Sequence, residues 1–282
     1  MHAIRTRIAR AIQELPAVPA VVIRVLRETT NENVSAGELE KLLAADQALS
    51  AKALRVVNSA YYGMSRQIES LSQAVVILGI QQLRNLVLSL SAMSMIKPQT
   101  TAQKEIHRRF WIHSVASANA AQALARAKKL STADQELAYI AGLLHDVGRL
   151  FLFTNFMETY MEIERRSGEG EPLDRVEKQN LGLTHAQVGQ VLAHVWRFPE
   201  RLGGLMGEHD GPFDGNSQPL AMVLHLAHCS ANAILWRTPI ETFAQTEPLL
   251  WMGWQPEDWA GFCQDMERKI VAYEGLYGTL AA

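Results

Sequence analysis

The chain has 282 residues, of which 48% are hydrophobic and 20% charged, so it can bury a sizeable core and is not a disordered tail. Its formal net charge of -2 creates no global basic field that would draw it onto nucleic acid or an anionic membrane, and we expect no strong nucleic-acid binding. Two cysteines are too few to predict disulfides or a cysteine-bound zinc site.

The N-terminus is basic but does not have the pattern of a signal peptide. Arg5, Arg7 and Arg10 come first, and Glu14 and Pro16 then interrupt any apolar core. No stretch reaches the roughly 18 uninterrupted apolar residues that a membrane-spanning helix needs. We therefore expect a cytoplasmic protein without a membrane partner.

The chain reads as a series of helices, with almost nothing that alternates as a strand would. Ser35 with Glu38, and Ser70 with Gln73, have the spacing of capping boxes ahead of helices that bury one face. Pro98–Thr101 breaks an apolar run and gives the best domain boundary. The expected divisions are an N-terminal helical half (1–98), a helical core with the histidines (99–237) and a C-terminal helical extension (238–282).

Two loops and a tryptophan-rich tail complete the predicted organisation. Residues 167–172 form a surface turn, and 211–219 form a longer loop near the candidate site, where it could act as a lid or a partner contact. Trp251, Trp254 and Trp259 lie in the tail. Such clustering favours a packed hydrophobic extension, and an exposed partner surface is the alternative.

The most informative feature is the pair His145-Asp146, which follows an apolar helical run. An imidazole and a carboxylate in such a place need partners, because burying an unpaired charge costs several kcal/mol or shifts the pKa until the group is neutral. A metal ion is the obvious partner. A core histidine bonded to a carbonyl oxygen is the alternative interpretation.

Further candidate ligands follow from the helical face that each histidine would occupy. His113 and His228 lie on apolar or small-residue stripes and point inward, as does His185, whereas His209-Asp210 falls in a Gly-rich turn region. Each alone could be an ordinary core histidine. Together with His145-Asp146 they favour one shared metal site.

The remaining histidines are weaker candidates. The helix that begins at His185 continues its apolar stripe through Leu192 and Val195, and His194 lies about half a turn away, where we expect it to be solvated. His107 is placed on another face of its helix, beside arginines, and is not a candidate.

The candidate ligand set is rich in nitrogen. Several imidazoles with Asp146 and Asp210 as the only carboxylates suit a divalent transition metal (Fe, Mn, Zn, Ni or Co) better than Mg or Ca, which prefer oxygen. The charge of these carboxylates makes one divalent ion reasonable, whereas two ions would be under-neutralised. The sequence therefore leaves the number of ions, one or two, undecided.

The order of these residues resembles the HD superfamily of metal-dependent phosphohydrolases. Upstream segments narrow the resemblance to the HDOD domain, and together the matching segments run from about Leu15 to about Ile234. The matching segments are Leu15–Pro19, Val34–Leu39, Asp46–Ser50, Val57–Gly63, Ser70–Val75, Leu78-Gly79, His185–Gly189 and Trp196–Pro199.

The resemblance implies an all-α, HD-domain-like helical bundle with an N-terminal helical subdomain. HDOD domains are a branch of bacterial signalling and regulatory proteins, many of which have lost metal ligands and have no established reaction. The resemblance therefore implies a signal-transduction protein that acts through signalling protein partners. This chain keeps a His-rich site, so a structural or sensory metal is expected with it.

The alternative function is an active phosphohydrolase acting on a nucleotide or another phosphate ester, with Asp146 and Arg149 in catalysis. His228 stands where an HD hydrolase has its last aspartate, and residues 211–215 lack the Gly-Tyr-Pro element of cyclic-di-GMP hydrolases. Arg149 could hold a phosphate-containing ligand bidentately. Equally, it could be a helix C-terminal cation favoured by the helix dipole.

Overall fold

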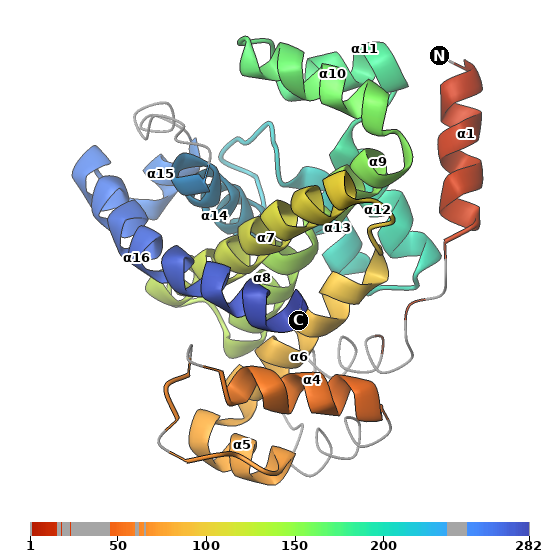
Figure 1. Ribbon diagram of the computed structural model, residues 1–282. Coiled ribbons are helices and arrows are strands. Elements are labelled where there is room, and N and C mark those ends of the chain that lie inside the picture. The colour runs from red at the N-terminus through yellow and green to blue at the C-terminus, as the bar shows by residue number, and fades with distance from the viewer. Residues whose placement is uncertain are drawn as a thin grey trace.

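The computed structural model describes residues 2–15, 18, 23, 46–59, 62–64, 66–235 and 247–281. Within these residues the chain forms α-helices and no β-strand, so the predicted all-α fold is confirmed (Figure 1). The helices in chain order are α1 (His2–Gln13), α4 (Gln47–Val57), α5 (Leu71–Leu78), α6 (Ile80–Met95), α7 (Thr101–Ala127), α8 (Thr132–Leu144), α9 (Val147–Asn155), α10 (Met157–Gly168), α11 (Leu173–Leu181), α12 (His185–Val195), α13 (Glu200–Glu208), α14 (Pro219–Leu235), α15 (Glu247–Met252) and α16 (Pro256–Ala281).

The long helix α7 runs through the middle of the bundle and packs against α8, α14, α9 and α16 (Figure 1). It begins with a complete capping box, in which the Thr100 hydroxyl accepts from the Gln103 backbone N–H and the Gln103 side chain accepts from the Thr100 N–H. Such a box satisfies two backbone donors that the first turn of a helix leaves unpaired. The predicted break at Pro98–Thr101 is therefore where α7 starts.

Close backbone approaches fix the helices that carry the candidate site. A Cβ atom on Gly148 of α9 would lie 2.1 Å from the carbonyl oxygen of His185 and 2.5 Å from the backbone nitrogen of Gly189, both in α12. A Cβ atom on Gly142 of α8 would lie 2.7 Å from the Cα of Ala118 in α7. Only glycine permits these close contacts. They bring α9 against α12 and α8 against α7 around residues 142–148.

The helices α4 and α5 lie at the end of the molecule opposite α10 and α11 in Figure 1, and α6 runs from there into the bundle, where it contacts α8. Ser70 caps α5 by accepting from the Gln73 N–H at 3.2 Å, but the Gln73 side chain accepts from the N–H of Glu69 rather than of Ser70, so the predicted box is only half formed. The other predicted pair, Ser35 with Glu38, lies outside the described residues.

The C-terminal extension packs on the bundle through α16. Trp259 is fully buried and stacks on Phe262, with ring centroids 6.0 Å apart, while Trp251 and Trp254 are partly buried. The packed-extension interpretation of the tryptophans therefore fits the structure. The stretch Thr132–Asn155, across α8 and α9, is long and apolar enough to cross a membrane, yet 83% of its 18-residue apolar window is buried inside the protein, as in the core of a bundle.

Candidate metal centre

His145 and Asp146 lie at the junction of two helices, where His145 ends α8 and Asp146 precedes α9. An aspartate in this N-cap position commonly accepts from a backbone N–H of the first turn. Asp146 makes no such bond, although its side chain is 1% exposed, and neither of its carboxylate oxygens has a hydrogen-bond partner. A buried carboxylate without a donor needs positive charge nearby; the Arg149 guanidinium lies 3.6 Å from Oδ2, whereas Oδ1 faces histidines.

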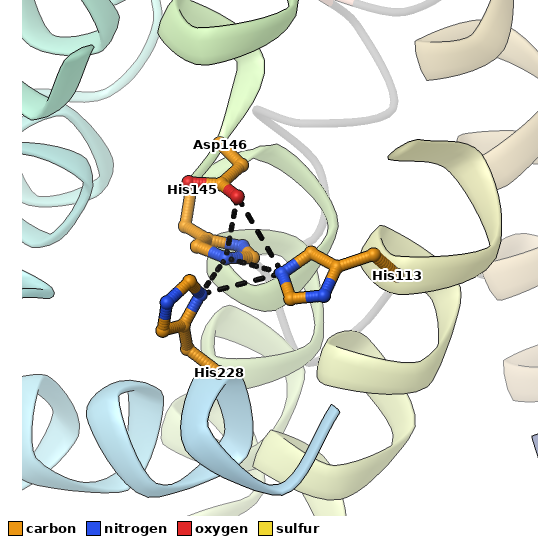
Figure 2. A group of neighbouring side chains, drawn as sticks. All are labelled: His113, His145, Asp146 and His228. Carbon is orange, nitrogen blue, oxygen red and sulfur yellow. Dashed lines mark hydrogen bonds and ion pairs between the residues drawn. The ribbon is translucent and has the colours of Figure 1, made fainter. Parts of the chain in front are cut away.

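Four side chains from α7, α14 and the α8–α9 junction converge on one point, and we call them the first set: His113, His145, Asp146 and His228 (Figure 2). The Nδ1 atom of His228 lies 2.8 Å from Nε2 of His145 and 3.3 Å from Nε2 of His113. Asp146 Oδ2 lies 3.5 Å from Nε2 of His113 and 3.7 Å from that of His145. These four ligand atoms surround a common centre.

The other oxygen of Asp146 faces a second set, formed with His185 and His209. Asp146 Oδ1 lies 3.4 Å from Nε2 of His185 and 3.5 Å from Nε2 of His209, and these two nitrogens are 3.3 Å apart. Asp210 lies against the same nitrogens, at 3.2 Å from His185 and 3.4 Å from His209. Asp146 is therefore shared, one oxygen to each set.

Hydrogen bonds outside the site determine which ring nitrogen can act as a ligand. Nδ1 of His145 lies 2.8 Å from the carbonyl oxygen of Gly142, and Nδ1 of His209 lies 2.9 Å from that of Met206. A carbonyl only accepts, so each Nδ1 carries a proton and each Nε2 is the ring nitrogen that faces inward. Metal-binding histidines are commonly oriented in this way.

His228 presents Nδ1 instead of Nε2. Its Nε2 lies 2.7 Å from the amide nitrogen Nδ2 of Asn232, one turn further along α14, and the Asn232 Oδ1 has no hydrogen-bond partner. With the amide turned so that Oδ1 accepts from the Nε2–H, both groups are satisfied and Nδ1 of His228 is left with a lone pair. That lone pair points at the first set.

Burial controls the charge of the first set. It lowers the pKa of His113 to about 3 and the pKa of His145 to about 4, and it also holds the pKa of His228 well below its ordinary value. Neutral imidazoles have lone pairs available for a metal at neutral pH. The first set is thus ready to bind without losing protons.

The second set has a different charge balance. Burial opposes the charged form of His185, but Glu177 and Asp210 outweigh it and raise the pKa of His185 well above its ordinary value. The pKa of His209 is raised against the same burial by Asp210 and Asp146. Positive charge is therefore favoured on His185 and His209, and a metal cation can take the place of their protons.

The separations between ligand atoms fit a metal. Two atoms bound at about 2.0–2.1 Å to one tetrahedral ion lie about 3.4 Å apart. The separations from 2.8 to 3.7 Å within the two sets lie around this value. All seven predicted ligands come together here, with six of them in the two sets and Asp210 beside the second.

Arg149 is not a helix C-terminal cation, and that interpretation is wrong. It lies in the first turn of α9, because the chain starts a new helix directly after Asp146. Its guanidinium donates to Glu164 at 2.5 and 3.0 Å and lies 3.6 Å from Asp146 Oδ2. Arg149 is 9% exposed and already engaged by carboxylates.

The structure also shows where three other side chains discussed in the sequence analysis lie. His194 is exposed, as expected. Val195 is also 46% exposed, because α12 ends there, so the predicted stripe from His185 stops at Leu192. His107 is buried rather than turned towards its neighbouring arginines, and it lines a cavity beside Asp146 without joining either set.

Sequence reasoning missed Glu177 and Asn232. Glu177 is fully buried and accepts from His185. The signal for it was present, since Glu177 stands between Leu173 and Leu181 at four-residue spacing, on the buried face of α11. Asn232, four residues after His228, is the ordinary spacing of a helical pair.

Comparison with known proteins identifies the family. The HDOD domain model matches residues 15–212, so the chain belongs to the HDOD family. Its fold is similar to the crystal structure of an HDOD domain protein of unknown function from Geobacter sulfurreducens, with a TM-score of 0.77, 22% identity and 96% of each chain covered. The predicted HDOD resemblance is thereby confirmed.

Two further structures and one curated relative are similar. A "Putative phosphohydrolase" from Shewanella amazonensis SB2B has a TM-score of 0.71 at 24% identity over 97% of each chain. A "Putative signal transduction protein" from Marinobacter aquaeolei VT8 has a TM-score of 0.76 at 20% identity, over all of this chain and 66% of that one. An uncharacterized protein of Treponema pallidum (strain Nichols) is 27% identical over 83% of this chain. The match covers only 45% of that relative's own length.

Proposed function

We propose that this HDOD protein is a signal-transduction module whose interior holds divalent transition-metal ions as a structural or sensory centre. The observation that carries the proposal is the Asp146 carboxylate. It is buried, it accepts no hydrogen bond, and it presents one oxygen to each of two groups of imidazole nitrogens. A cation in each set would satisfy every one of these atoms.

The residues present fit such ions. The first set offers His113, His145, His228 and one oxygen of Asp146, and the second offers the other oxygen with His185, His209 and the nearby Asp210. When bound, the ions supply Lewis acidity and a bond between helices that are distant in the chain. Nitrogen-rich ligation favours Fe, Mn, Zn, Ni or Co.

The same ligands join α7, α8, α12, α13 and α14, which suits a regulatory role. A bound ion stabilises only the arrangement in which these helices meet, so its presence or absence shifts the balance between conformations. We infer that this shift is passed to a signalling protein partner, in keeping with the family, and that the protein acts in the cytoplasm.

Two features argue against hydrolysis of a phosphate ester. The cavity that reaches Asp146, lined by His107, Phe110 and Trp111, has a volume of about 30 Å³, enough for about two water molecules. Arg149, the side chain expected to hold a phosphate, is engaged by Glu164. A substrate would need both a wider opening and a free guanidinium.

The second candidate is an active phosphohydrolase, and one observation favours it. The side chain of Asp210, which lies beside the second set, is 34% exposed, so solvent reaches the edge of that set. In this case Asp146 would hold the metals and Arg149, released from Glu164, would hold the phosphate.

Turnover separates the two candidates. Protein purified without an affinity tag is supplied with Fe²⁺, Mn²⁺ or Zn²⁺ and assayed with p-nitrophenyl phosphate, its bis-ester and a set of nucleotides. We expect metal binding without turnover above the background of the His145→Ala variant. Metal-dependent turnover that is lost in His145→Ala but kept in His194→Ala, a matched change at an exposed histidine, would overturn the regulatory proposal.

A further inference from the structure

Glu177 of α11 is a fully buried carboxylate outside the two ligand sets. Taking a carboxylate out of water costs several kcal/mol unless other groups compensate its charge. Among the described residues its donors are the Tyr160 hydroxyl and the backbone N–H and Nδ1 of His185, with neither lysine nor arginine among them. The ion-pair partner of Glu177 is therefore the titratable side chain of His185 rather than a lysine or an arginine.

The contact with His185 is closely constrained. Nδ1 of His185 lies 2.9 Å from both oxygens of Glu177, and the His185 backbone N–H donates to Oε2 at 3.0 Å. A carboxylate that receives three donors is acceptor only, so Nδ1 is protonated, and Nε2, which faces Asp146 and His209, is the ring nitrogen left for a metal. Glu177 thus sets both the tautomer and the direction of the ring.

A comparison within the site shows that orientation alone does not require a carboxylate. His145 and His209 have their tautomers set by the neutral carbonyl oxygens of Gly142 and Met206. His185 has a charged acceptor instead, in an equally buried place. The feature special to Glu177 is therefore its charge.

Tyr160 of α10 holds Glu177 in turn. Its ring and hydroxyl are fully buried, and the hydroxyl donates to Oε1 of Glu177. The chain of contacts runs from Tyr160 through Glu177 to His185, and so connects α10, α11 and α12 with the second set.

We propose that Glu177 is a positioning residue that allows the second set to hold its own divalent ion, so that the centre takes two ions rather than one. This inference rests on the proposed metal site. Two divalent ions carry four positive charges, and the carboxylates of Asp146, Asp210 and Glu177 supply three negative ones. With Glu177 counted, two ions no longer leave the interior strongly under-neutralised.

The test is the Glu177→Gln variant, which keeps the size of the side chain and an acceptor for Nδ1 but removes the charge. Metal is counted by mass spectrometry after equilibrium dialysis, and the two affinities are followed by the absorption of added Co²⁺. We expect two ions in the wild type, an unchanged first ion in the variant, and a second ion bound about 10- to 100-fold more weakly. Tyr160→Phe, which removes only a hydroxyl, should weaken the same ion by less.

Controls separate positioning from folding. Glu136→Gln changes another buried carboxylate, paired with Arg84 between α8 and α6, and should leave both affinities unchanged. In a His185→Ala background, Glu177→Gln should cause no further loss of metal affinity. If Glu177→Gln weakens the binding of both ions equally, this inference fails while the proposed metal site stands. It also fails if neither Glu177→Gln nor Tyr160→Phe weakens the binding of either ion. Failure of the wild type to take up any ion instead overturns the proposed function.

Discussion

Nε2 of His145 and Nδ1 of His228 lie 2.8 Å apart in the interior of the bundle. The outer nitrogen of each ring is engaged, by the carbonyl of Gly142 and the amide of Asn232. With their protons on those outer nitrogens, the two facing atoms both carry lone pairs, which repel at this distance. A cation between them removes the repulsion, and the folded structure is arranged around that place.

The shared carboxylate predicts an unequal response to substitution. Asp146→Asn removes the charge that faces both sets, so we expect neither ion to survive dialysis, whereas His185→Ala should lose only the second. Metal content per chain after dialysis checks this. Retention of one ion in Asp146→Asn would show that the two sets do not share the carboxylate.

Removal of the metal is expected to lower stability. An ion present at about 100 times its dissociation constant stabilises the folded state by about 2.7 kcal/mol, provided that it does not bind the unfolded chain. Chelation should therefore lower the melting temperature of the wild type in calorimetry and leave the Asp146→Asn variant unaffected. An identical melting temperature for wild type with and without chelator contradicts a structural role for the ions.

The two sets should differ in their response to pH. Because burial lowers the pKa values of His113 and His145 to about 3 and about 4, protons do not compete for the first set near neutral pH. The raised pKa values of His185 and His209 mean that binding to the second set must displace protons, so its affinity rises with pH.

This difference can be measured with one set at a time. His185→Ala leaves the first set, and its metal affinity should be flat between about pH 5.5 and 8. His113→Ala leaves the second set, and its affinity should increase over the same range. The same slope in both variants would contradict the assigned charge states.

Gly148 predicts a mechanical test of the site. A methyl group there would lie 2.1 Å from the carbonyl oxygen of His185, which neither backbone can yield easily. Gly148→Ala should push α9 from α12, lower the free energy of unfolding by at least the 1–3 kcal/mol or so typical of overpacking, and weaken the second ion. Gly204→Ala, on α13 with open space around it, is the matched control and should be neutral or slightly stabilising.

Much of the centre could be predicted from the sequence because histidine on an apolar helical stripe is unusual. His113, His185 and His228 were placed inward by that pattern, and His209 by its turn. The order of the ligands then indicated the family. The all-α fold followed from helical spacing and capping signals.

Other features depend on tertiary contacts that no local pattern contains. The chain could have continued as one helix through His145, and only the structure shows a new helix at Val147 that changes the environment of Arg149. His107 is buried because the neighbouring helices cover its face. The four-residue spacing of Glu177 with Leu173 and Leu181 indicates a buried position, but only the structure shows that His185 of α12 is its partner.

We infer that the interior holds two metal ions that share Asp146. The most direct measurement is the metal content of protein purified without an affinity tag or chelator, by inductively coupled plasma mass spectrometry, with metal atoms counted per chain. We expect two transition-metal ions per chain in the wild type and none in Asp146→Asn. A wild type that takes up no more than one ion, even after reconstitution with Fe²⁺, Mn²⁺ or Zn²⁺, would contradict this.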